Sequence, residues 1–115
     1  MSERSFYGGA VDLIAEATER HGPGFRLDPE MTAELPTISI LTEALAKRTE
    51  GQYDIEVDDN MRLTVSVVCD ELILDSTNVK EFCQLVRLAD ATGFSTPGVD
   101  MMTIRFRFDR FWKKV

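Results

Sequence analysis

The sequence predicts an α+β fold with helices packed mostly on one face of a three- or four-stranded, mainly antiparallel sheet. Three segments have helical periodicity, three alternate apolar and polar residues, and their order along the chain is α-α-β-β-α-β. The last helix joins two strands, so a parallel pair with a right-handed crossover is an open alternative. The chain has 115 residues and no internal repeat or linker, so we expect one domain over residues 1–115.

Two helices are expected before the first strand. The first runs from about Gly8 to His21, where a Gly-Pro-Gly sequence ends it. The second begins at the capping residue Asp28, and Pro36 should kink or restart it before it continues to about Glu50. The side chains expected to face the core are Val11, Ile14, Ala15 and Ala17 in the first helix, with Phe6 and Tyr7 just ahead of them, and Ile38, Ile40, Leu41, Ala44 and Leu45 in the second.

A β-hairpin follows, because Tyr53–Asp58 and Leu63–Val67 both alternate apolar with polar residues. A two-residue loop would place Val57 beside Arg62 and so mix apolar with polar side chains. A three-residue loop, Asp59–Met61, brings the two apolar sets opposite each other, and we choose this register. The expected pairs are Val57 with Leu63, Ile55 with Val65, Tyr53 with Val67, and Asp58 with Arg62.

The third helix is expected after the second strand bends near Asp70 and continues to about Leu74. Asn78 and Glu81 resemble a capping box, and the helix should run from about Val79 to Thr92. The side chains expected to face inward are Val79, Phe82, Cys83, Leu85, Val86, Leu88 and Ala89.

A turn and a final strand complete the predicted fold. Gly93 should end the third helix, and Ser95–Gly98 is typical of a turn. The final strand should run from Met102 to about Phe108, with an aromatic inward face that anchors the core. That face consists of Ile104, Phe106 and Phe108.

Charge is divided unevenly along the chain. The net charge is −7, but residues 101–115 contain five basic residues and one acid, so residues 1–100 carry −11. An acidic body repels phosphate and attracts basic proteins, which disfavours nucleic acid as a partner. Solubility alone is the alternative explanation of the acidity.

The acidic residues of the hairpin form the first candidate site. Alternate strand residues lie about 7 Å apart on one face, so Asp54, Glu56 and Asp58 should line a charged surface. A calcium loop starting at Asp54 would need glycine at position 59 and glutamate at position 65, and the sequence has neither. A solvated sheet face is the alternative to a docking surface for a basic partner. The candidate partner-binding residues are Asp54, Glu56, Asp58, Asp59, Asp70, Glu71 and Asp75.

The basic C-terminal segment forms the second candidate site. Arginines and lysines beside aromatic residues suit single-stranded nucleic acid, which binds by stacking and charge. The alternative is that Arg105 and Arg107 neutralise Asp54 and Glu56 across the sheet while Trp112 caps the core. The candidate residues are Arg105, Arg107, Arg110, Trp112, Lys113 and Lys114.

The sequence contains no recognisable catalytic, metal or cofactor motif. The one histidine, His21, lies at a helix end, and Cys69 and Cys83 are expected to be buried as small apolar residues. No phosphate loop is present. We therefore expect a protein that is not an enzyme and binds no cofactor. No membrane-spanning or signal segment is visible, which indicates a cytoplasmic protein.

Three functions are compatible with this reading. The first is an acidic protein-binding module, such as an inhibitor, an immunity protein or a phage anti-defence protein, that occupies a basic site with DNA-like electrostatics. The second is nucleic-acid binding through the last strand. The third is a structural or assembly subunit that forms a homodimer through Phe111, Trp112 and an open strand edge. The charge and the missing chemistry favour the first.

Overall fold

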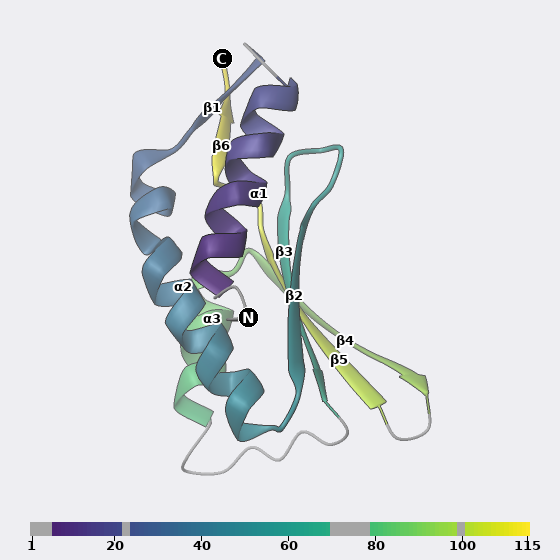
Figure 1. Ribbon diagram of the computed structural model, residues 1–115. Coiled ribbons are helices and arrows are strands. Elements are labelled where there is room, and N and C mark those ends of the chain that lie inside the picture. Colours follow the sequence, from purple (N-terminus) through teal and green to yellow (C-terminus); the bar gives the residue numbers. More distant parts are fainter. Residues whose placement is uncertain (1–5, 22–23, 70–78, 99–100) are drawn as a thin grey trace, which may run out of the picture.

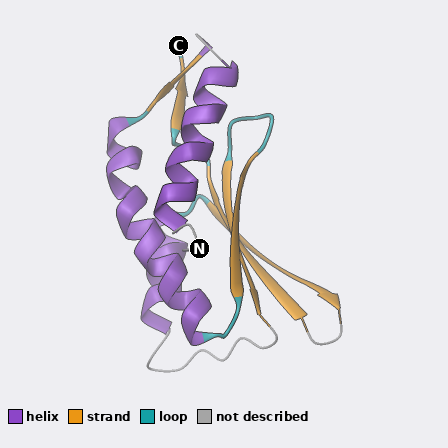
Figure 2. Cartoon of the chain, viewed as in Figure 1, coloured by secondary structure: helices purple, strands orange, loops and turns teal. Residues whose placement is uncertain are grey.

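Three helices lie on one face of a four-stranded antiparallel sheet, and no helix covers the opposite face in the described part of the chain (Figures 1 and 2). This computed structural model describes residues 6–21, 24–69, 79–98 and 101–115. The predicted α+β class with helices on one face of the sheet is confirmed. In chain order the elements are α1 (Phe6–His21), β1 (Phe25–Leu27), α2 (Pro29–Arg48), β2 (Gln52–Val57), β3 (Leu63–Cys69), α3 (Val79–Leu88), β4 (Ala91–Gly98), β5 (Met101–Phe108) and β6 (Trp112–Lys114).

The main sheet has the strand order β2-β3-β5-β4, and each of these neighbours pairs antiparallel. The alternative of a parallel pair is therefore wrong. The chain leaves α3 into β4 and reverses into β5, which then pairs with β3. The predicted hairpin register is confirmed, because Val57 pairs with Leu63 and Ile55 with Val65.

The hairpin loop has the predicted length because Met61 adopts a left-handed conformation, with φ of 60°. The Met61 N–H donates to the carbonyl oxygen of Asp58 at 3.1 Å. The Met61 side chain is buried, so its packing holds a backbone conformation that glycine adopts more readily.

The third helix is shorter than predicted. It ends at Leu88, and the Asp90 N–H donates to the carbonyl oxygen of Arg107 at 2.8 Å, where the pairing with β5 begins. Residues 91–98, expected as the end of a helix followed by a turn, form the edge strand β4 instead. Hydrogen bonding of residues 91–98 to β5 outweighed the local helical periodicity. A pairing between distant segments of this kind is not visible in the local sequence pattern.

A second sheet of two short strands was not predicted. Strand β1 pairs antiparallel with β6, with Leu27 opposite Trp112. The Asp28 N–H donates to the carbonyl oxygen of Phe111 at 2.8 Å, which ties the start of α2 to the C-terminal segment. The Asp28 carboxylate also caps α2, as predicted, by accepting from the Glu30 N–H at 3.1 Å.

Pro36 does not interrupt α2, contrary to the prediction. The residue is exposed, so its ring needs no room in the core. The missing N–H leaves the carbonyl of Thr32 without its helical donor, and Thr32 is an exposed residue. Buried Leu35 and Ile38 on either side hold the helix against the sheet, and this packing outweighs the loss of one hydrogen bond.

The core lies between the helices and the inner face of the main sheet. The inward set predicted for β5 is fully buried, and so are the inner residues of β3. Fully buried side chains from the helices, the main sheet and the C-terminal segment include Ile38, Leu45, Leu63, Val65, Val67, Leu85, Ile104, Phe106, Phe108 and Phe111.

Several side chains expected in the core are exposed. In α3, Leu85 is fully buried while Val86 and Cys83 are exposed. Apolar side chains occur on two adjacent faces of this helix. The face that contains Leu85 packs against the core and α2, and the face that contains Val86 and Cys83 is left in contact with water. Of the two cysteines, only Cys69 is buried as predicted. Exposed residues that were expected inward are Tyr7, Val11, Ala15, Ile40, Cys83 and Val86.

The end of α2 depends on a close approach between two backbones. The Gly51 N–H donates to the carbonyl oxygen of Ala46 at 2.8 Å, and Glu50 adopts a left-handed φ of 54°. These features form a Schellman-type helix end. A Cβ atom on Gly51 would lie 2.4 Å from the carbonyl oxygen of Val68, so only glycine fits between α2 and β3.

We expect Gly51→Ala to lower the free energy of unfolding by roughly 2 kcal/mol, because the added methyl overlaps backbone that cannot move freely. Gly93→Ala is the matched control, since nothing lies within 4 Å of a Cβ at that position. Chemical denaturation of both variants measures the difference. Equal stability of the two variants would contradict the assigned contact.

Candidate partner-binding surfaces

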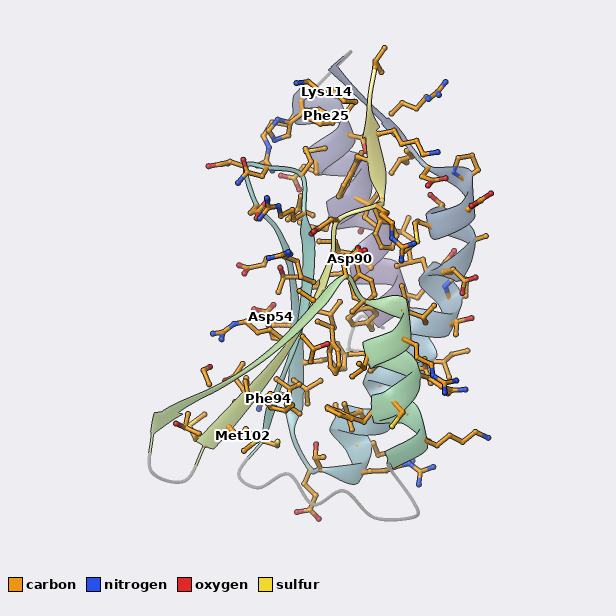
Figure 3. The ribbon with its side chains drawn as sticks, turned by 180° about the vertical axis from the view of Figure 1, so that it is seen from behind. Phe25, Asp54, Asp90, Phe94, Met102 and Lys114 are labelled. Carbon is orange, nitrogen blue, oxygen red and sulfur yellow. The ribbon has the colours of Figure 1, made fainter. Side chains whose placement is uncertain are left out.

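The acidic residues of β2 lie on the open face of the sheet. Tyr53 and Ile55 face the helices, with the Tyr53 ring 5.4 Å from that of Phe6, so Asp54 and Glu56 face the other way. Figure 3 shows Asp54 on the side of the sheet away from the helices. Asp59 is exposed in the adjoining loop. The structure therefore brings three of the predicted acidic residues to one edge of the sheet.

Asp58 lies at the start of the same loop, and its carboxylate accepts hydrogen bonds from the loop backbone. Its Oδ1 accepts from the N–H of Asn60 at 2.9 Å and from the N–H of Arg62 at 3.0 Å. This Asx-type arrangement closes the loop. The three remaining acidic candidates, Asp70, Glu71 and Asp75, lie outside the described residues.

The charge of the side chains on the open sheet face changes from strand to strand, from acidic on β2 through uncharged on β3 to basic on β5. Ser66 on β3 separates Asp54 from Arg105, and Thr64 separates Glu56 from Arg107 in the same way. Each acid therefore lies two strand spacings, about 10 Å, from the arginine in its row. The predicted direct neutralisation across the sheet is wrong, because β3 lies between the two charged strands.

The arginines of β5 are held by nearer partners. Arg105 donates to Ser95 Oγ at 2.8 Å, and Arg107 pairs with Asp109 at 2.9 Å. In contrast, Asp54, Glu56 and Asp59 form no ion pair with any Lys or Arg of the described ranges. On the sheet face, β2 therefore carries carboxylates without an ion pair to a described Lys or Arg, and β5 carries one arginine in an ion pair and one that donates to a neutral hydroxyl.

The remaining basic candidates lie around the second sheet. Arg110 pairs with Asp90 at 3.0 Å, and Lys113 Nζ lies 3.8 Å from an oxygen of Asp28. Lys114 is exposed. Lys113 and Lys114 belong to the two-stranded sheet, whereas Arg105 and Arg107 belong to the four-stranded sheet, so the five basic candidates form no single surface.

Trp112 is buried and only 5% exposed. Its Nε1–H donates to Thr18 Oγ1 at 2.8 Å, and its ring centroid lies 6.2 Å from that of Phe111. This ring caps the core between α1 and β6, which was one of the two roles expected for it. A buried ring presents no face on which a base can stack.

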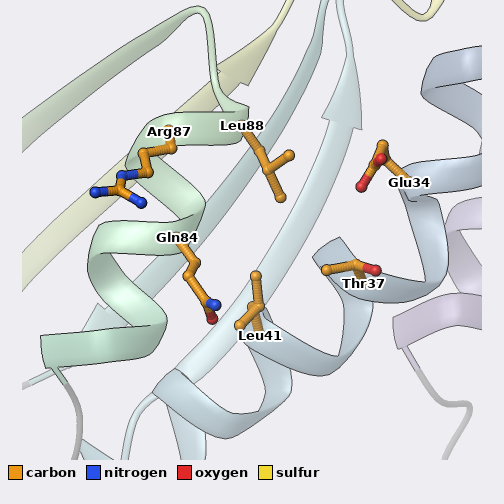
Figure 4. Close-up of a pocket in the computed structure, with 6 residues that line it drawn as sticks. All are labelled: Glu34, Thr37, Leu41, Gln84, Arg87 and Leu88. Atoms are coloured by element: carbon orange, nitrogen blue, oxygen red, sulfur yellow. The ribbon is translucent and has the colours of Figure 1, made fainter.

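A small pocket of about 240 Å³ lies between α2 and α3 (Figure 4). Leu41 and Leu88 point into it, while Glu34 and Arg87 come from the two opposite helices. Its lining residues include no histidine or cysteine. The remaining lining residues are Thr37 and Gln84.

Other chemistry is equally sparse in the described ranges. No three His, Cys, Asp or Glu side chains there gather closely enough to hold a metal ion. None of the described helices combines the length and apolar character needed to cross a bilayer. Comparison with protein-family models, with curated proteins and with solved structures finds no match to this chain. Function is inferred from geometry and charge.

The burial of Trp112 predicts a distinct fluorescence behaviour. We expect emission at a shorter wavelength than in the unfolded chain, and weak quenching by iodide, because the ring is shielded from water. Single-stranded oligonucleotide added at low salt should leave the emission unchanged. Strong quenching by either agent would contradict the buried placement, and quenching by the oligonucleotide would favour nucleic-acid binding.

Proposed function

We propose that this protein is a small protein-binding module that places an acidic surface against a basic site of a partner protein. The observation that carries the proposal is the state of the charges on the open sheet face. Asp54, Glu56 and Asp59 are exposed without an ion pair to a described Lys or Arg, whereas Arg107 is paired with Asp109 and Arg105 donates to Ser95 Oγ. The negative charge is thus available to a partner.

The flat shape of this surface supports the proposal. Asp54 and Glu56 project from an extended strand about 7 Å apart. The residues directly opposite them on the neighbouring strand are Ser66 and Thr64, whose side chains are short. A partner surface can therefore approach without rearrangement of the sheet.

The partner class follows from the charge. A net charge of −7 gives a field that speeds association with a basic protein and slows it with nucleic acid. A basic nucleic-acid-binding site is one surface of this kind. The proposal includes proteins that block such sites by DNA-like electrostatics, namely inhibitors, immunity proteins and phage anti-defence proteins.

The test compares two doubly neutralised variants. Asp54→Asn with Glu56→Gln removes two charges from the sheet face, and Glu16→Gln with Glu19→Gln removes two from the exposed side of α1. The two proteins have the same net charge and nearly unchanged shapes. Partners are captured from lysate at low salt and identified by mass spectrometry, and the association rate of the purified pair is then measured.

We expect the sheet-face variant to associate roughly three- to tenfold more slowly, and the α1 variant to associate almost as fast as the parent. Added salt should slow the parent and have less effect on the sheet-face variant. Failure to recover a partner, or an association rate indifferent to salt, would sink the proposal. Equal slowing of both variants would show that only net charge matters and would remove the sheet face from it.

A further inference from the structure

The main sheet has two open edges, and they differ in charge. The strand order leaves β2 at one edge and β4 at the other, and within the described ranges β4 pairs with β5 alone (Figure 1). The backbone of an edge strand can pair with another chain, and charged side chains are one device that prevents this. On β2, Asp54 and Glu56 are charged, and Asp54 Oδ1 also accepts from the Ile55 N–H at 2.9 Å. Residues 91–98 of β4 include no charged residue, so this edge lacks that protection.

An aromatic side chain is exposed at the centre of the β4 edge. Phe94 is 55% exposed, although it lies opposite the buried Ile104 and therefore on the inner face of the sheet. Its ring centroid lies 6.0 Å from that of Phe82 on α3, which is itself only partly buried. Val86, one turn further along α3, is also exposed. The inner face of the sheet thus ends at β4 in apolar side chains that the fold leaves uncovered.

The sequence of β4 identifies the strand that fits this edge. Residues 92–96 are Thr-Gly-Phe-Ser-Thr, which is nearly the same segment in both directions. Two copies paired antiparallel about the central residue therefore place like side chains opposite each other. The pairs are Phe94 with Phe94, Gly93 with Ser95, and Thr92 with Thr96. Aromatic pairs and threonine pairs are favourable across antiparallel strands, so a second copy of the chain is a complementary partner for this strand.

The pairing is short and needs the apolar contacts beside it. Pro97 has no N–H to donate, and the register of β4 with β5 shifts between Ser95 and Gly98, so regular pairing ends near Thr96. Pairing about Phe94 would bring the two Phe94 rings together, each next to the Phe82 ring of its own copy. The resulting aromatic cluster would bury surface that is exposed in the single chain.

The distribution of charge permits two copies to meet at β4. Asp54 and Glu56 lie on β2, three strand spacings or about 14 Å from β4. In a joined sheet the two β2 strands lie at opposite ends, about 34 Å apart. This separation exceeds a Debye length of about 8 to 10 Å, so their repulsion is largely screened. Asp90, directly before β4, is paired with Arg110 at 3.0 Å.

We propose that the protein forms a two-fold symmetric dimer in which the β4 strands of two copies pair antiparallel about Phe94. The two four-stranded sheets then form one sheet of eight strands. Phe111 and Trp112, which the sequence led us to expect in a homodimer contact, are buried in the single chain, so the strand edge remains for this role. The proposal goes beyond the function proposed above and does not depend on it, since the acidic β2 strands remain open.

The test measures self-association and locates the contact. Sedimentation equilibrium gives the dissociation constant of the dimer, and amide hydrogen exchange at low and high protein concentration shows which strand becomes protected. Phe94→Lys places a positive charge at the two-fold axis. Ile40→Lys is the matched control, because it makes the same change of charge at an exposed apolar residue of α2, far from the edge at β4.

We expect the parent to dimerise as its concentration rises, with slower exchange at residues 92–96. Phe94→Lys should raise the dissociation constant at least about tenfold, and Ile40→Lys should leave it nearly unchanged. Added salt should preserve or strengthen the dimer, because it screens the repulsion between two chains of net charge −7. Since Phe94 is more than half exposed, the dilute Phe94→Lys variant should unfold close to the parent's transition.

Three outcomes would overturn the inference. The parent could remain monomeric at every concentration, protection could appear on β2 instead of β4, or the two lysine variants could weaken the dimer equally. The exchange measurement uses the parent protein, so it does not depend on the folding of a variant. None of these results bears on the acidic-surface proposal, whose variants at Asp54 and Glu56 lie on the opposite edge of the sheet.

Discussion

The burial of β3 and β5 against the helices is the constraint on which the rest of the structure depends. Leu63, Val65 and Val67 of β3 are fully buried, as are the facing Ile104 and Phe106 of β5. Because side chains alternate along a strand, a slip of one residue would expose this entire set and bury polar groups. The same constraint directs Asp54, Glu56 and the arginines of β5 to the open face.

The parts of the fold that rest on strong alternation could be predicted from the sequence, including the hairpin register and the buried face of β5. The remainder depended on contacts between distant segments. Strand β4 is held by β5 and has no apolar alternation as strong as that of β3. Strands β1 and β6 have three residues each, too few for a periodicity. On α2, the apolar residues Ile38, Ile40 and Leu41 are close together in sequence and cannot all face the core. The packing of the helix buries Ile38 and Leu41 and leaves Ile40 exposed to water.

The two candidate binding surfaces, like the fold, could be predicted from the sequence only where they depend on local alternation. Alternation places Asp54 and Glu56 on the outer face of β2 without further information. The order of the strands in the sheet could not be predicted from local sequence patterns. The expected neutralisation of Asp54 by Arg105 required β5 to lie next to β2. In the fold, β3 separates them. Likewise, the burial of Trp112 depends on the pairing of β6 with β1, which no pattern in the sequence predicted.

The proposed acidic surface would contribute to binding mainly through the rate of encounter. Exposed carboxylates such as Asp54 and Glu56 act over roughly a Debye length, about 10 Å, so they accelerate encounter and their effect weakens with salt. Contacts made after docking act only at short range and chiefly set the dissociation rate. The salt dependence of the two rate constants would therefore separate the contribution of the sheet-face charge from that of the contacts formed later.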